Sequence, residues 1–244
     1  MSPAVVLVHG IRSSATMWGR QQAALEAAGV PAVAPDLPGH GTRRHEDFTI
    51  DGALATIEDA AATAGRDGPV VVAGLSMGSY LALHWTARTT RTPAAVLAAS
   101  CCTQPQGAGL SAYRALAGLI GRLPDGGAGL NAFMARKFVP EAGRADLEAG
   151  GMAISVMADA LAGMTGVDTL ADLTRIDAPV WLVNGRWDHF RGNERRFLAA
   201  TRHGRLVIVP GATHLVSLTH PVAFNRVLLE LVDEVADASG TMAA

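Results

Sequence analysis

The sequence predicts an α/β fold in which a mostly parallel central sheet carries helices on both faces. Two observations lead to this prediction. Short runs of β-branched and apolar residues recur without polar alternation, as is typical of strands buried on both faces. Helical patterns separate these runs, and such alternation indicates βαβ units. The chain has 244 residues, 49% of them hydrophobic, and is therefore long enough and apolar enough to bury a sizeable core.

The individual elements follow from these runs and from the turn residues that bound them. The expected strands are "AVVLVH" (4–9), "PAVAPD" (31–36), "PVVVAG" (69–74), "AAVLAAS" (94–100), "APVWLVNG" (178–185) and "GRLVIVPG" (204–211). The expected helices of the same unit are 15–28, 51–66, 77–89, 191–202 and 221–237.

One long stretch, 103–175, interrupts the alternation because it contains no convincing strand. Three of its segments have helical patterns separated by Gly and Pro, namely "LSAYRALAGLIGRL", "LNAFMARKF" and "ADLEAGGMAISVMADALAGM". We therefore expect residues 1–102 and 176–238 to form one α/β core and residues 103–175 to be a helical insertion. The last residues, 239–244, are expected to be a flexible tail.

Composition excludes several classes of function. The formal net charge is −2 and the basic residues are scattered, so neither nucleic acid nor an anionic membrane is an expected partner. Cys101 and Cys102 are adjacent, which makes a disulfide between them difficult and gives no zinc-ligand spacing. No signal peptide precedes the first strand and no apolar run is long enough to span a membrane, so we expect a reduced, cytoplasmic protein.

The chemistry begins at "GLSMG" (74–78), which matches the pattern G-x-S-x-G. It falls between a predicted strand and a predicted helix, where the serine, Ser76, would lie on a tight turn at the end of the sheet. The helix N-terminus there favours developing negative charge. The alternative is that Ser76 only caps the helix. A nucleophilic serine also needs a base, and that requirement separates the two interpretations.

Eight histidines compete to be that base: His9, His40, His45, His84, His189, His203, His214 and His220. His214 stands out because it lies in "GATHLV", between the last strand and the last helix. In a parallel sheet this loop ends at the same edge as the Ser76 turn. We therefore predict that His214 is the base.

The base needs a carboxylate that orients it. Asp188 follows a strand in "WLVNGRWDHF" and would lie at the same edge, although an Asx-turn is the alternative role. Asp36 also ends a strand, but "PDLPGHG" is more typical of a turn. The chain order is then Ser76, Asp188, His214, which is the order of the α/β-hydrolases.

The sequence resembles α/β-hydrolase fold enzymes of the esterase, lactonase and C–C hydrolase type. The matching segments are "VHG" (8–10), "PDLPGHG" (35–41), "GLSMGS" (74–79), "NGRWD" (184–188) and "GATH" (211–214). They occur in family order and span nearly the whole chain. One departure is Ser79, where many relatives have a second glycine.

The resemblance implies that the backbone N–H groups of Ile11 and Met77 form an oxyanion hole and that 103–175 is a cap over the pocket. It also implies that the chain starts at the family's third strand, without the outer strands. The expected function is a serine hydrolase that cleaves a carboxylic ester, lactone or thioester of a small, mainly apolar molecule and needs no cofactor or metal. The alternatives are a C–C bond hydrolase or lyase with the same triad, and a non-catalytic receptor with this fold.

Overall fold

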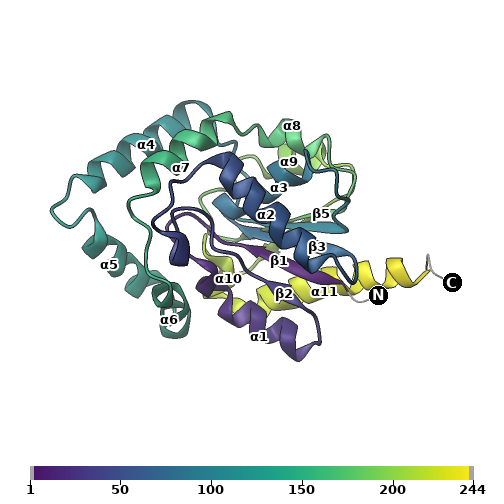
Figure 1. The fold of residues 1–244 in the computed structure, drawn as a ribbon. Helices are drawn as coiled ribbons and strands as arrows, with labels where there is room; N and C mark the ends of the chain where they lie inside the picture. The colour runs from purple at the N-terminus through teal and green to yellow at the C-terminus, as the bar shows by residue number, and fades with distance from the viewer. Residues whose placement is uncertain (1–2, 242–244) are drawn as a thin grey trace.

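The computed structural model describes residues 3–241 and has three layers, with a six-stranded sheet between two layers of helices (Figure 1). All paired strands are parallel, in the order β2-β1-β3-β4-β5-β6. The strands are β1 (Ala4–Val8), β2 (Ala32–Val33), β3 (Val70–Leu75), β4 (Ala95–Ala99), β5 (Val180–Gly185) and β6 (Gly204–Val209). The predicted α/β fold is confirmed.

Two helical layers cover the sheet. The helices of the α/β unit are α1 (Gly19–Ala27), α2 (Ile50–Ala64), α3 (Met77–Thr86), α8 (Thr169–Leu173), α9 (Glu194–Ala200), α10 (Val216–Thr219) and α11 (Pro221–Thr241), with single 3-10 turns at Ala15–Trp18 and Gly41–Arg43. Helices α2, α3 and α9 contribute to the core on one face of the sheet, and α1 and α11 to the core on the other face (Figure 1).

The burial of the strands explains their apolar sequences. In β1, Val5 and Leu7 pack into the core on the α1–α11 side, whereas Val6 and Val8 pack into the core on the α2–α3 side. Every residue of β1, β3, β4 and β5 is buried. These strands therefore have apolar side chains on both faces, as a doubly covered parallel sheet requires.

The strand order reverses between β1 and β3. The chain passes from β1 to β2 at one edge and returns to pair β3 with the other side of β1, with Val8 opposite Gly74. Such a switch point leaves a crevice at the carboxyl ends of the strands, where ligands bind in open α/β sheets. The loops that follow β1 and β3 consequently lie next to each other.

Helices alone occupy the described stretch between β4 and α8. They are α4 (Gly107–Gly121), α5 (Ala128–Phe138), α6 (Glu141–Ala149) and α7 (Met157–Gly163), with a 3-10 turn at Met164–Gly166. Figure 1 shows α4, α5 and α6 at one end of the molecule, beyond the end of the sheet. We call residues 107–166 the cap segment.

Three expected elements differ from the structure. The strand expected over 31–36 is only Ala32–Val33, because Pro35 has no N–H to donate to the ladder. The helix expected across 145–164 is interrupted after Ala149, where Gly151 has a φ of +72°. A side chain at Gly150 would also collide with Ser14, since its Cβ would lie 1.9 Å from the Ser14 Oγ.

The third difference concerns the end of the chain. Residues 239–244 were expected to be a flexible tail, but α11 continues as a helix to Thr241. The rest of that expected tail, 242–244, lies outside the described residues. Within this extension the Ser239 hydroxyl donates to the carbonyl of Val235 at 2.8 Å, a bond between residues four apart in the helix.

Candidate active site

Ser76 occupies the sharp turn between β3 and α3, with a φ of 55° and a ψ of −120°. Non-glycine residues rarely adopt positive φ, and a strained backbone of this kind persists only where its surroundings enforce it. The Ser76 N–H donates to the carbonyl of Ala99 at 2.8 Å, which fixes the turn against β4. The Ser76 side chain makes no capping hydrogen bond to α3, so the alternative of a simple helix cap is wrong.

The glycines on either side of Ser76 are required by close backbone contacts. A Cβ at Gly78 would lie 2.1 Å from the carbonyl oxygen of Val8 in β1. A Cβ at Gly74 would lie 2.5 Å from the backbone of Gly78 and Ser79. The G-x-S-x-G pattern therefore allows α3 to start directly against the sheet, with Ser76 at its N-terminus.

The structure brings Ser76, His214 and Asp188 together from three separate loops. His214 Nε2 lies 3.0 Å from Ser76 Oγ, and His214 Nδ1 lies 2.9 Å from Asp188 Oδ1. A carboxylate only accepts hydrogen bonds, so Nδ1 carries the proton and Nε2 is free to accept one from the serine hydroxyl. This is the geometry that a serine nucleophile, a base and an orienting acid require.

Asp188 is held as a carboxylate at this position. Its side chain is buried, and burial alone would raise its pKa. The hydrogen bond and charge of His214, together with the Phe190 N–H that donates to Asp188 Oδ1 at 2.8 Å, outweigh burial and lower the pKa below the ordinary value of 3.8. The acid is therefore ionised near neutral pH and stabilises a positive charge on His214.

Ser100 fixes the backbone that carries the base. It follows β4 with a φ of 58°, is fully buried, and donates its hydroxyl proton to the carbonyl of His214 at 2.6 Å. The sequence analysis did not identify this residue. A signal was present, because "LAASCC" places a polar side chain at the end of a strand that neighbours the Ser76 strand.

Two backbone N–H groups near Ser76 have no partner among residues 3–241. They belong to Ile11, in the loop after β1, and Met77, the first residue of α3. Residues at a helix N-terminus have N–H groups without an intrahelical acceptor, and the helix dipole adds positive potential there. These are the two amides that the sequence resemblance assigns to an oxyanion hole.

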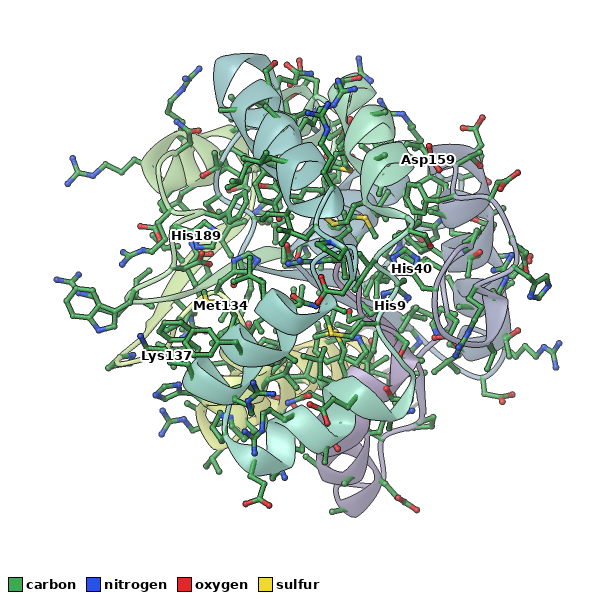
Figure 2. All side chains as sticks on the ribbon, turned by 90° about the vertical axis from the view of Figure 1, so that its left-hand side faces the viewer. His9, His40, Met134, Lys137, Asp159 and His189 are labelled. Carbon is green, nitrogen blue, oxygen red and sulfur yellow. The ribbon has the colours of Figure 1, made fainter. Side chains whose placement is uncertain are left out.

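The loop that contains Ile11 is fixed by His9. The Leu37 N–H donates to His9 Nε2 at 3.0 Å, so the ring proton is on Nδ1 and is donated to the Gly10 carbonyl at 2.9 Å. Burial, together with charge repulsion from His40, whose ring centre is 4.8 Å away, lowers the pKa of His9 to about 4. His9 is therefore neutral and structural, and Figure 2 shows it beside His40.

Asp36 is not part of the Ser76 group. Its carboxylate accepts hydrogen bonds from the Ala15 N–H and from both the N–H and the hydroxyl of Thr42, each at 2.8 Å. These bonds organise the "PDLPGHG" turn, which is the role that the sequence predicted.

His84, on α3, belongs to a buried ion-pair cluster away from Ser76. Its Nδ1 lies 2.7 Å from Asp172 Oδ2, and Arg88 donates to the other oxygen of Asp172. The cluster connects α3 to α8. Its residues are thus partnered in the fold and not free to act as bases.

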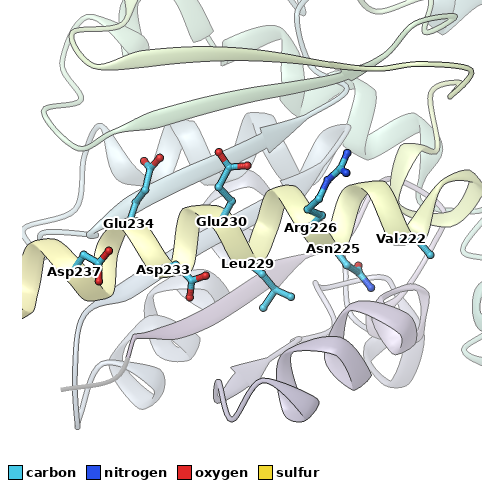
Figure 3. A pocket seen from close by; sticks show the side chains of 8 residues that line it. All are labelled: Val222, Asn225, Arg226, Leu229, Glu230, Asp233, Glu234 and Asp237. Atoms are coloured by element: carbon cyan, nitrogen blue, oxygen red, sulfur yellow. The ribbon is translucent and has the colours of Figure 1, made fainter.

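One hollow at the surface lies on α11 and is not lined by Ser76, Asp188 or His214. A shallow groove of about 670 Å³ runs along α11, lined by Val222, Asn225, Arg226, Leu229, Glu230, Asp233, Glu234 and Asp237 (Figure 3). All of these residues belong to one helix, and Glu230 and Glu234 already pair with Arg205. An open, one-sided groove of this kind lacks the enclosing walls of a ligand pocket.

Across residues 3–241, no helix has both the length and the apolar character that a bilayer crossing requires. One group of potential metal ligands occurs in the same range, formed by Asp188, His189 and His214. Cys101 and Cys102 are buried thiols, and burial raises the pKa of Cys101 well above its ordinary value.

Comparison with known proteins identifies the relatives of this fold. The sequence pattern of the "Alpha/beta hydrolase family" matches residues 5–227. A curated protein, lipase LipV of Mycobacterium tuberculosis, is 36% identical over 84 residues, which are 34% of this chain and 31% of the lipase. The match thus spans only about a third of that relative.

Solved structures resemble the chain over almost its full length. A thermophilic esterase from Thermogutta terrifontis has a TM-score of 0.76 and 22% identity, covering 96% of this chain and 90% of the esterase. The enol-lactonase from Burkholderia xenovorans LB400 has a TM-score of 0.74 and 18% identity, covering 96% and 92%. At such low identity these likenesses establish the shared fold alone.

Proposed function

The chain belongs to the alpha/beta hydrolase family, and from this premise we propose that it is a serine hydrolase that cleaves carboxylic esters through an acyl-enzyme on Ser76. The observation that carries the proposal is the continuous hydrogen-bonded series from Asp188 through His214 to Ser76. The free N–H groups of Ile11 and Met77 supply the remaining requirement, which is stabilisation of the oxyanion.

The reaction follows from the positions of the protons. Ser76 Oγ attacks the ester carbonyl while its proton moves to His214 Nε2, and Asp188 stabilises the resulting imidazolium. The carbonyl oxygen becomes negative and accepts hydrogen bonds from the Ile11 and Met77 amides. His214 then donates the proton to the leaving alcohol oxygen as the C–O bond breaks. A water molecule repeats the attack on the acyl-enzyme and releases the acid.

The cap segment supports an apolar substrate. Seven large apolar side chains of α4, α5 and the turn between them are exposed: Leu116, Leu119, Leu123, Leu130, Phe133, Met134 and Phe138. Others from the same segment, such as Ala160 and Met164, are buried and hold α7 and the following turn onto the α/β unit. An acyl or alcohol group that approaches from the cap side therefore meets mainly hydrocarbon. We propose a neutral, mainly apolar ester of modest size.

The test is hydrolysis of a matched set of esters, lactones and thioesters, together with β-diketones that report C–C cleavage. The proposal predicts turnover of neutral esters and a mass increase on Ser76 equal to the acyl group when the reaction is quenched early. Turnover of the diketones alone would favour the C–C hydrolase alternative. Binding without turnover of any compound would favour a receptor and contradict the proposal.

A further inference from the structure

His189 lies beside the proposed triad but has no part in the acyl-transfer steps. It directly follows Asp188, and its Nδ1 lies 3.8 Å from the same Asp188 Oδ1 that His214 contacts at 2.9 Å. Its ring centre is 4.9 Å from that of His214. Two imidazole nitrogens therefore lie within 4 Å of one carboxylate oxygen.

This arrangement contains the ligand types that Zn²⁺ selects. One ligand atom from each of Asp188, His189 and His214 lies within 4.8 Å of the others. Zinc binds histidine nitrogen and carboxylate oxygen at about 2.0–2.2 Å, with three protein ligands and one open position at many sites. We propose that these three residues form an inhibitory binding site for Zn²⁺ or a similar transition-metal ion.

The carboxylate has unused capacity for a cation. Asp188 Oδ2 is buried and has no hydrogen-bond partner within the described part of the chain. The two histidine nitrogens lie against the other oxygen, Oδ1, so an ion between them would give Oδ2 a partner where the carboxylate binds it with both oxygens.

His189 can reach a shared ion because its side chain is largely free. Its exposed fraction is 69%, compared with 20% for His214 and 0% for Asp188. Figure 2 shows His189 on the same side of the molecule as Met134 and Lys137 of α5.

The ion would stop catalysis by displacing one proton. A neutral imidazole has a single N–H, which His214 has on Nδ1 facing Asp188. Coordination of the metal at Nδ1 moves that proton to Nε2, so Nε2 can no longer accept the proton of Ser76. No bond to the substrate is involved, and removal of the ion restores the original tautomer.

The consequence for catalysis rests on the proposed function, but binding of the ion does not. Binding is therefore measured directly on the metal-free full-length chain, by calorimetry with Zn²⁺ and by the visible absorption of Co²⁺ bound in place of Zn²⁺. Ester hydrolysis is measured in parallel during the same Zn²⁺ titration. The variants are His189→Gln and, as a matched control, His203→Gln, which removes an exposed histidine elsewhere on the molecule.

The proposal predicts saturable binding of one ion, an absorption band of tetrahedral Co²⁺, and loss of hydrolysis that a chelator reverses. His189→Gln should retain basal hydrolysis and weaken both binding and inhibition by at least about tenfold. His203→Gln should behave as the unmodified protein. Equal binding by the His189→Gln protein, or loss of binding only in the His203→Gln protein, would overturn the proposed site even if the chain hydrolyses esters normally.

Discussion

Strand β3 and helix α4 have similarly apolar sequences, "VVVAGL" and "GAGLSAYRALAGLIG", yet their environments are opposite. Every residue of β3 is buried, and the strand ends at the strained Ser76 turn. Among its described side chains α4 has none that is fully buried, and Leu116 and Leu119 are exposed by 52% and 63%. We therefore expect the two elements to have different roles. The buried sheet edge fixes the positions of the reacting atoms, and the exposed apolar helix is available to a substrate.

This comparison predicts that changes at the sheet edge affect the chemical step most. Ser76→Ala and His214→Ala should each lower kcat by roughly 10⁴- to 10⁶-fold, since members of a triad act as one unit. Neither side chain fills the core, so the melting temperature should stay close to that of the unmodified protein. Steady-state kinetics with a thermal melt on each variant checks both parts, and near-normal turnover by either folded variant would show that the assignment is wrong.

Variants of Asp188 and Asp36 test the same prediction with two carboxylates. Asp188→Asn should lower kcat by roughly 10⁴-fold, because the amide favours the wrong tautomer of His214. Asp36→Asn should mainly lower the free energy of unfolding, by about 1–3 kcal/mol, because Asp36 only accepts bonds from Ala15 and Thr42. Kinetics and denaturant titrations of both variants test this prediction. A larger loss of kcat from Asp36→Asn than from Asp188→Asn would make Asp36 the orienting acid and Asp188 the structural one.

The buried side chain of His9 also predicts that the stability of the fold depends on pH. His9 has a pKa of about 4 in the folded chain and 6.5 as its ordinary value, so the unfolded chain binds more protons between these limits. Its contribution is present above pH 6.5 and decreases as the pH falls toward 4. The shift corresponds to about 3 kcal/mol. Denaturant titrations at several pH values should therefore show a shallower acid loss for His9→Gln than for the unmodified chain, whereas parallel curves would contradict the neutral, buried His9.

The cap segment should show the smallest effects, and they should depend on the substrate. In a series of p-nitrophenyl esters from acetate to dodecanoate, each methylene that contacts apolar surface should add up to about 0.8 kcal/mol to binding, until the chain no longer fits. Phe133→Ser should reduce this dependence without lowering kcat for the acetate. The matched control is Val222→Ser, an exposed apolar residue on α11. A preference for esters with a terminal carboxylate would argue against an apolar site.

The sequence was most informative where packing leaves little freedom. The G-x-S-x-G corner could be predicted because side chains at Gly74 and Gly78 would collide with backbone, and the parallel sheet brings the loops of Asp188 and His214 to the same edge. Those three side chains indeed lie together. The break of the expected 145–164 helix was harder to predict, because it depends on a contact of Gly150 with Ser14 that is distant in the sequence.

The contacts of His214 could not be predicted from sequence patterns, although "LAASCC" marks Ser100 as a polar residue at a strand end. Ser100 reaches the His214 carbonyl, and Phe190 lies with its ring centre 4.9 Å from the His214 ring. Both contacts join residues whose separation in the chain carries no periodic signal. The exposed apolar face of α4 and α5 was likewise not predicted, because an apolar helical pattern does not tell which neighbour covers it.

The most direct test of the account is covalent labelling with a fluorophosphonate, which reacts only with a serine that a neighbouring base activates. The account predicts that one equivalent of probe attaches to Ser76, that ester hydrolysis is lost in proportion, and that the His214→Ala protein does not react. Peptide mass spectrometry locates the label. Attachment at another serine, or full ester hydrolysis by protein that remains unlabelled, would contradict the central claim that Ser76 is the nucleophile.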